Sequence, residues 1–95
     1  MNEVWYEVEG VDERFRRIVH EIQADWENNL PTVMEHIASE CAHDYHWNHG
    51  GMEKSWPLQF VFYKTRTSEA LATGSVHRSL DAVFFSKIRL TKKET

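Results

Sequence analysis

Histidines are concentrated towards the middle of this sequence, where they have metal-ligand spacing. Three of them fall within seven residues, and a fourth histidine and a glutamate precede them at helical spacing: His43, His46, His49, His36 and Glu40. On a helix, His36, Glu40 and His43 share one face, and Glu40-x-x-His43 has the spacing that supplies ligands in di-metal carboxylate bundles. Imidazole and carboxylate ligands favour zinc or another borderline ion.

A complete site of that kind needs a second copy of the motif, which a single chain of this sequence lacks. A symmetric dimer could supply it, and the sequence leaves the oligomeric state open. Histidines near a helix C-terminus also interact favourably with the helix dipole, which accounts for them without a metal. We therefore expect no metal and no other cofactor, and we keep a metal-binding protein that uses the histidine-rich helix end as an alternative function.

The sequence offers little for catalysis. It has no phosphate-binding glycine loop, no paired CxxC, no HExxH and no nucleophile elbow. Its one cysteine, Cys41, lies on the apolar stripe of an expected helix, where a buried thiol is usually an inert packing residue. We expect a protein that is not an enzyme.

Tryptophans and acidic residues point instead to a protein partner. Residues 1–57 hold 4 Lys and Arg against 12 Asp and Glu, a charge of −8, whereas residues 58–95 hold 7 against 3, a charge of +4. Trp47 and Trp56 flank a glycine pair, and tryptophan is a common interface anchor, although both could simply close the core. The sequence predicts a regulatory or inhibitory protein-binding module, of the kind that phages or mobile elements encode. Its predicted contact residues are Trp47, Trp56, Glu21, Asp25, Glu40 and Asp44.

A nucleic-acid partner is a further alternative. Alternation along the last expected strand places Lys87 and Arg89 on the same face as Val83 and Phe85. A sheet that displays aromatic rings between basic residues is suited to single-stranded nucleic acid. The overall charge of −4 and the pI near 5.8 argue against this alternative.

Hydrophobic periodicity predicts an α+β fold of the order β-α-α-β-β-β. Strands are expected at residues 4–9, 58–63, 71–78 and 82–90, and amphipathic helices at residues 11–28 and 32–45. Thr32 and Glu35 have the form of a capping box for the second helix. The two helices should form a hairpin on one face of an antiparallel sheet of three or four strands. The expected core residues are Leu58, Phe60, Phe62, Phe84, Ile88, Ile18, Ile22 and Ile37.

The length of 95 residues predicts a single domain over residues 1–90, followed by a frayed polar tail at residues 91–95. One cysteine permits no disulfide within the chain. The first residues have no basic and apolar signal pattern, and apolar runs are too short for a membrane span. We expect a cytoplasmic protein that does not bind membranes.

Overall fold

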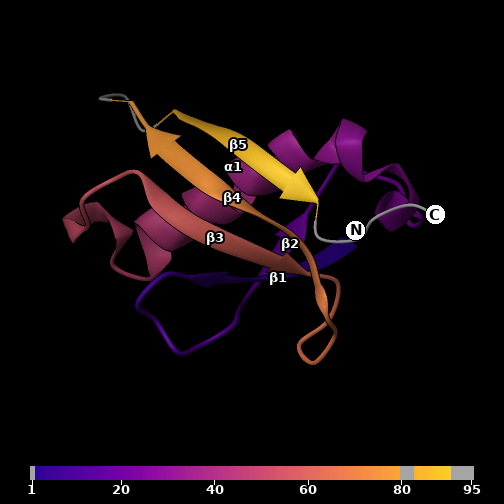
Figure 1. The fold of residues 1–95 in the computed structure, drawn as a ribbon, viewed down its shortest axis with the longest axis horizontal. Coiled ribbons are helices and arrows are strands. Elements are labelled where there is room, and N and C mark those ends of the chain that lie inside the picture. The colour runs from indigo at the N-terminus through magenta and orange to yellow at the C-terminus, as the bar shows by residue number, and fades with distance from the viewer. Residues whose placement is uncertain (1, 80–82, 91–95) are drawn as a thin grey trace.

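The computed structural model describes residues 2–79 and 83–90 and has an α+β architecture, as predicted (Figure 1). The described residues form a five-stranded sheet, one long helix and two short 3-10 turns. In chain order the elements are β1 (Asn2–Val8), β2 (Phe15–Val19), η1 (Trp26–Asn29), α1 (Leu30–Asn48), η2 (Gly51–Glu53), β3 (Leu58–Tyr63), β4 (Ala70–Arg78) and β5 (Phe84–Leu90).

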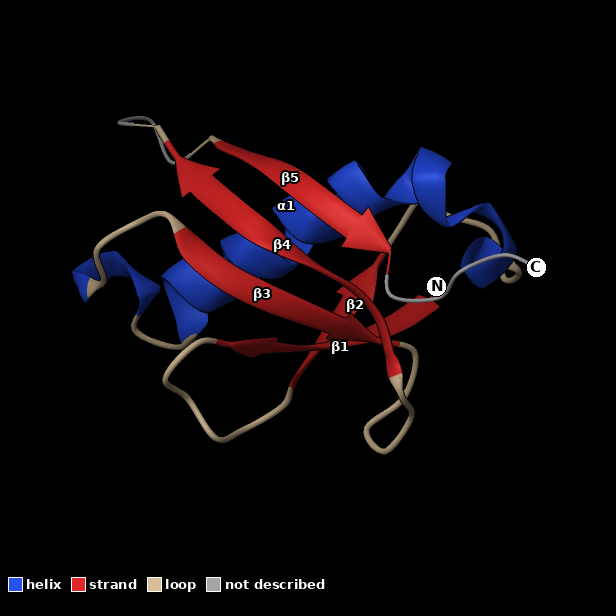
Figure 2. Cartoon of the chain, viewed as in Figure 1, coloured by secondary structure: helices blue, strands red, loops and turns tan. Residues whose placement is uncertain are grey.

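The strands lie in the order β2-β1-β3-β4-β5, and every neighbouring pair is antiparallel. Seen as in Figure 2, α1 lies behind β3, β4 and β5 and crosses that side of the sheet. The front of these three strands is covered by no helix of the described residues, and we call it the open face. The molecule therefore has two layers, with the core between α1 and the rear of the sheet.

The predicted first helix is wrong. Residues 15–19 form β2, which pairs with β1 so that Phe15 lies opposite Tyr6, and only η1 is helical within residues 11–28. The chain therefore has a single long helix and no helical hairpin. The cause is Arg17, which lies opposite Val4 on the core side of the sheet and interrupts the alternation typical of a strand. A charged residue in a core-facing position made the helical period fit residues 11–28 better than the strand period.

The second predicted helix is confirmed, but it is longer than predicted. α1 has 19 residues and begins two residues before Thr32, so the Thr32 and Glu35 capping box is not formed. Pro31 occupies the first turn, where its missing N–H costs nothing. The helix ends as expected: Gly50 adopts a φ of 82°, in the left-handed region that glycine tolerates.

The core contains most of the predicted residues, together with tyrosines that the prediction omitted. Leu58, Phe60, Phe62, Phe84 and Ile37 are buried, whereas Ile18, Ile22 and Ile88 are only half-buried. Tyr6 and Tyr45 are the two largest of the fully buried side chains. The last three strands are confirmed within the described residues. The first residue of the last predicted strand and the predicted tail lie outside them.

Gly74 sets the close approach of β4 to β5. It lies opposite Phe60 on one side and Ile88 on the other, within the central part of the sheet. A Cβ atom at this position would lie 2.1 Å from the Lys87 carbonyl oxygen and 2.8 Å from the Ile88 Cα. Both are backbone atoms, so they cannot move away without displacing β5.

We expect Gly74→Ala to lower the free energy of unfolding by about 1–3 kcal/mol or more, because the methyl group overpacks the sheet. Urea denaturation measures this loss. The matched control is Ser75→Ala, one residue along on the open face, which should change stability by no more than about 0.5 kcal/mol. Equal effects of the two substitutions would contradict the close β4–β5 approach.

Candidate functional site

A buried carboxylate, Asp44, connects α1 to the first two strands. The Tyr6 hydroxyl donates a hydrogen bond of 2.6 Å to Asp44 Oδ2, and Asn48 Nδ2 donates one of 2.9 Å to Oδ1. Arg17 Nη1 lies 3.6 Å from Oδ1, and His49 Nε2 lies 3.3 Å from Oδ2. Asp44 therefore has polar partners on β1, on β2 and at the end of α1, and its side chain is only 9% exposed.

Arg17 also binds Glu40, a second residue of the predicted partner-contact set. Arg17 Nη2 donates a hydrogen bond of 3.1 Å to Glu40 Oε1. Its Nε atom is buried and has no acceptor among the described residues. Asp44 and Glu40 thus face the interior and the β2 side of the helix, where they hold Arg17, and Asp44 is not available to a partner.

Burial dominates the electrostatics of this network. It raises the pKa of Tyr6 far above its usual 10.0, and the hydrogen bond to Asp44 adds to the shift. Burial also raises the pKa of the Cys41 thiol, and Asp44 adds to that shift as well. Cys41 is fully buried, so its position matches the predicted packing role and holds its thiol in the protonated form.

The residues that the alternative metal site would use lie in different environments. His36 Nε2 lies 3.2 Å from the His20 carbonyl oxygen, and the His49 ring stacks on Phe15 with centroids 4.0 Å apart. His46 is buried, and its Nδ1 atom lies 3.3 Å from Arg78 Nη1. Within residues 2–79 and 83–90, no three His, Cys, Asp or Glu side chains are grouped as a metal site requires.

The pKa of His46 is lowered, first by burial and then by Arg78 and His43. His46 is therefore held neutral, which suits it to accept a hydrogen bond from Arg78. It belongs to a cluster of rings at the end of α1. The His46 ring meets the Trp47 ring edge-on at 4.6 Å and the Phe84 ring at 5.7 Å.

The two predicted tryptophan anchors differ in exposure. Trp56 is half-buried, packs against Phe84 with centroids 5.3 Å apart and donates an indole hydrogen bond of 2.9 Å to the Gly51 carbonyl oxygen. It closes this end of the core. Trp47 is 52% exposed, so it alone of the two is available as an anchor.

Exposed apolar side chains gather at this end of the molecule. Four large hydrophobic side chains of the described residues are more than half exposed: Trp47, Met52, Val83 and Phe85. They come from the end of α1, from η2 and from the start of β5. Phe84 joins the start of β5 to the end of α1, because it packs against His46 and Trp56. We call these four side chains together the apolar end; Phe85 lies on the open face, on the opposite side of β5 from Phe84. Sequence reasoning missed Met52, which lies in the short turn η2 and belongs to no helical or strand period.

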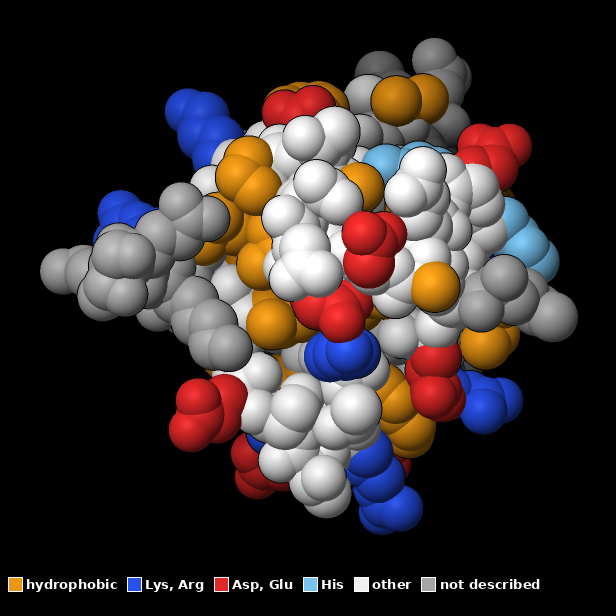
Figure 3. All heavy atoms as spheres, turned by 90° about the vertical axis from the view of Figure 1, so that its right-hand side faces the viewer, with side chains coloured by type: hydrophobic (Ala, Val, Ile, Leu, Met, Phe, Trp, Pro, Cys, Tyr) orange, Lys and Arg blue, Asp and Glu red, His pale blue; other side chains and the backbone are white. Residues whose placement is uncertain are grey.

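The remaining predicted acidic residues lie near the other end of α1. Glu21 lines a cavity of about 400 Å³ with Thr32 and Val33, and Asp25 precedes η1. Fourteen helical residues separate Val33 from Trp47, which is about 21 Å of helix. Figure 3 faces this part of the molecule and shows acidic and basic side chains interspersed. The predicted contact residues therefore do not form one continuous acidic surface.

Ion pairs engage five of the twelve carboxylates in residues 1–57. They are held by arginine or lysine: Glu3 by Arg16, Glu7 by Arg14, Glu40 and Asp44 by Arg17, and Glu27 by Lys64. The paired lysine lowers the pKa of Glu27.

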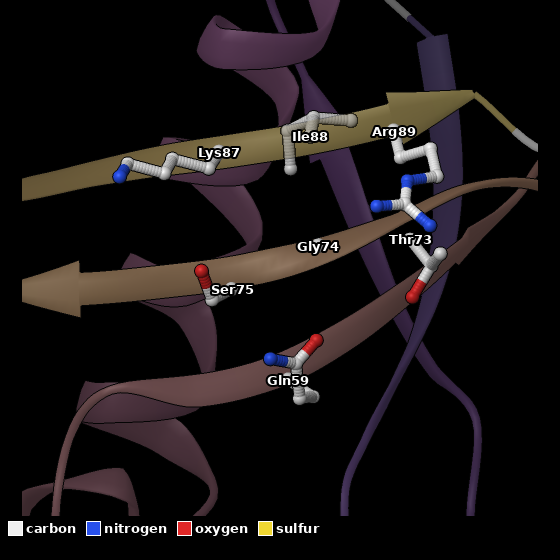
Figure 4. Close-up of a pocket in the computed structure, with 7 residues that line it drawn as sticks. All are labelled: Gln59, Thr73, Gly74, Ser75, Lys87, Ile88 and Arg89. Carbon is white, nitrogen blue, oxygen red and sulfur yellow. The ribbon is translucent and has the colours of Figure 1, made fainter.

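The open face carries the basic residues of β5. Figure 4 shows side chains from β3, β4 and β5 around one shallow hollow of about 410 Å³, with α1 behind the sheet. The hollow is lined by Gln59, Thr73, Gly74, Ser75, Lys87, Ile88 and Arg89. Phe85 is exposed and Phe84 buried, so the predicted alternation of β5 is confirmed.

Comparisons with models of known protein families, with curated proteins and with solved structures find no match to this chain. No helix among the described residues is long and apolar enough to cross a membrane.

We expect Tyr6→Phe to destabilise the fold by about 1–3 kcal/mol at neutral pH, because Asp44 loses a buried donor. The raised pKa of Tyr6 also makes the stability of the wild type fall as pH rises above 10.0, where the unfolded chain ionises first. The difference between wild type and variant should therefore narrow above that pH. Urea denaturation from neutral to alkaline pH measures both effects.

Tyr45→Phe is the matched control for the hydrogen bond. Tyr45 is equally buried, and its hydroxyl has no hydrogen-bond partner among the described residues. Tyr45→Phe should lower the free energy of unfolding by less than Tyr6→Phe does at neutral pH. An equal or larger cost would show that the Tyr6–Asp44 hydrogen bond does not stabilise the fold.

Proposed function

We propose that this chain is a non-enzymatic protein-binding module, regulatory or inhibitory, whose contact surface is the apolar end. One observation carries the proposal: all four large hydrophobic side chains that are more than half exposed among the described residues belong to this end. Scattered apolar side chains are normal on protein surfaces, whereas clustered ones are typical of interaction sites.

Trp47 is the expected anchor. Its ring is held edge-on by His46 at 4.6 Å, and His43 lies beside it with ring centroids 6.1 Å apart. A tryptophan that is already positioned loses little side-chain entropy on binding. Aromatic anchors of this kind carry much of the binding energy in protein interfaces. The expected partner is a protein that presents an apolar recess for the Trp47 indole.

The acidic residues have a smaller part in this proposal than the sequence predicts. Glu21 and Asp25 are separated from Trp47 by more than the length over which charges act at physiological salt, about 8 Å. Glu40 and Asp44 are engaged by Arg17. Binding should therefore depend on apolar contact at Trp47 and Met52 and only weakly on these carboxylates.

Trp47→Ala should weaken binding by at least about 2 kcal/mol, close to 30-fold in Kd, mainly through faster dissociation. The partner is first captured from a lysate of the cells that encode this chain, and its affinity is then measured by surface plasmon resonance. Met52→Ala should weaken binding less. Double reversal of Glu21 and Asp25 to Lys should leave Kd within a few-fold of the wild type.

Trp5→Ala is the control for the loss of an indole, because Trp5 is half-buried on β1 and lies opposite Arg16 and Tyr63, away from the apolar end. Thermal denaturation of each variant confirms that it is folded. Sedimentation of the purified chain tests whether the partner is a second copy of itself. A partner that binds wild type and Trp47→Ala equally would contradict the proposal.

A further inference from the structure

The charge of the open face is positive where β4 meets β5. The register places Lys87 opposite Ser75 and Arg89 opposite Thr73, and both basic side chains are exposed. Neither has a carboxylate within 4.0 Å among the described residues, whereas Glu3 and Glu7 on β1 are paired with arginines. The two cations are therefore free to pair with an anion that approaches this face.

A pair of stacked aromatic rings adjoins these cations. His77 and Phe85 face each other across β4 and β5, with ring centroids 5.2 Å apart and only 2° between the ring planes. Phe85 remains 59% exposed, so much of its ring is accessible. Sheets that bind single-stranded RNA use exposed aromatic rings of this kind to stack bases.

The spacing along β5 places the ring of Phe85 in line with the two cations. Phe85, Lys87 and Arg89 are alternate residues, so successive side chains on this face stand about 6.8 Å apart. Beside them lies the hollow of about 410 Å³, which Gln59 and Ser75 also line. Their side-chain polar atoms form no hydrogen bond with other described residues and are available to base edges or sugar hydroxyls.

We infer that the open face of β3, β4 and β5 binds single-stranded nucleic acid, with Lys87 and Arg89 on phosphates and Phe85 stacked on a base. This site goes beyond the proposed protein-binding function and uses a surface next to the apolar end. An acidic peptide would satisfy the two cations, but it would leave the parallel His77–Phe85 rings and the hydrogen-bonding hollow unused. Nucleic acid uses all three features together.

The net charge of −4 means that the chain as a whole does not attract nucleic acid. Attraction at long range is weak, so affinity depends on a few direct contacts and on stacking. Two phosphate contacts on a single strand predict a slope of about −1.4 for the logarithm of the binding constant against the logarithm of salt concentration. A strongly basic protein would show a much steeper slope.

The test is fluorescence anisotropy with short labelled oligothymidine and oligouridine between about 50 and 200 mM salt. Lys87→Ala and Arg89→Ala should each weaken binding and reduce the salt slope by about 0.7. Phe85→Ala should weaken binding about 5- to 150-fold and leave the slope unchanged, because stacking releases no counterions. The salt slope therefore distinguishes phosphate contacts, which change it, from base stacking, which changes only the affinity.

The charge-matched control is Lys54→Ala with Arg66→Ala, which removes two exposed cations away from the open face and should leave binding unchanged. Trp47→Ala should also leave it unchanged, so failure of this inference is distinct from failure of the proposed function. Polyglutamate and duplex DNA serve as competitors without accessible bases. Absence of binding to either oligonucleotide, equal competition by polyglutamate, or no effect of Phe85→Ala would each overturn the inference.

Discussion

The placement of one carboxylate inside the protein determines how the helix and the first two strands fit together. Asp44 is taken out of water, which is costly for an ion unless donors and opposite charge compensate it. Tyr6 supplies the donor from β1 and Arg17 the charge from β2. Removal of one partner leaves Asp44 with fewer buried contacts, so these residues stabilise the fold as a set.

This internal network uses polar side chains to hold the fold together and leaves other side chains exposed for binding. Four polar side chains, Asp44, Arg17, Tyr6 and Glu40, are used to join α1 to the sheet. What remains exposed is of two kinds: apolar side chains where α1 ends, and cations with an aromatic ring on the open face. Phe85 lies where the two surfaces adjoin, so a protein and a nucleic acid bound together would come close at this residue.

The sequence predicts the parts of this fold in which apolar residues follow one clear period. Phe60 and Phe62 alternate with outward residues, and Met34, Ile37 and Cys41 recur at helical spacing, so β3 and α1 were predicted correctly. β2 was not, because Arg17 occupies a core-facing position that its distant partners Glu40 and Asp44 make tolerable. The apolar end could be predicted only in part: Trp47 is an expected anchor by residue type, but the exposure of Met52 and Val83 at the same end depends on the tertiary fold.

The strand order has a consequence for how the chain folds. β1 pairs with β2 through a short local connection, but its other neighbour, β3, follows only after α1. Tyr6 pairs with Phe62, a contact that closes a loop of more than half the chain. Such distant pairings slow folding, and until β3 arrives the inner edge of β1 presents unpaired backbone groups to other chains. During synthesis, the β1–β2 hairpin therefore exposes the edge of β1 to aggregation until β3 has been made and pairs with it.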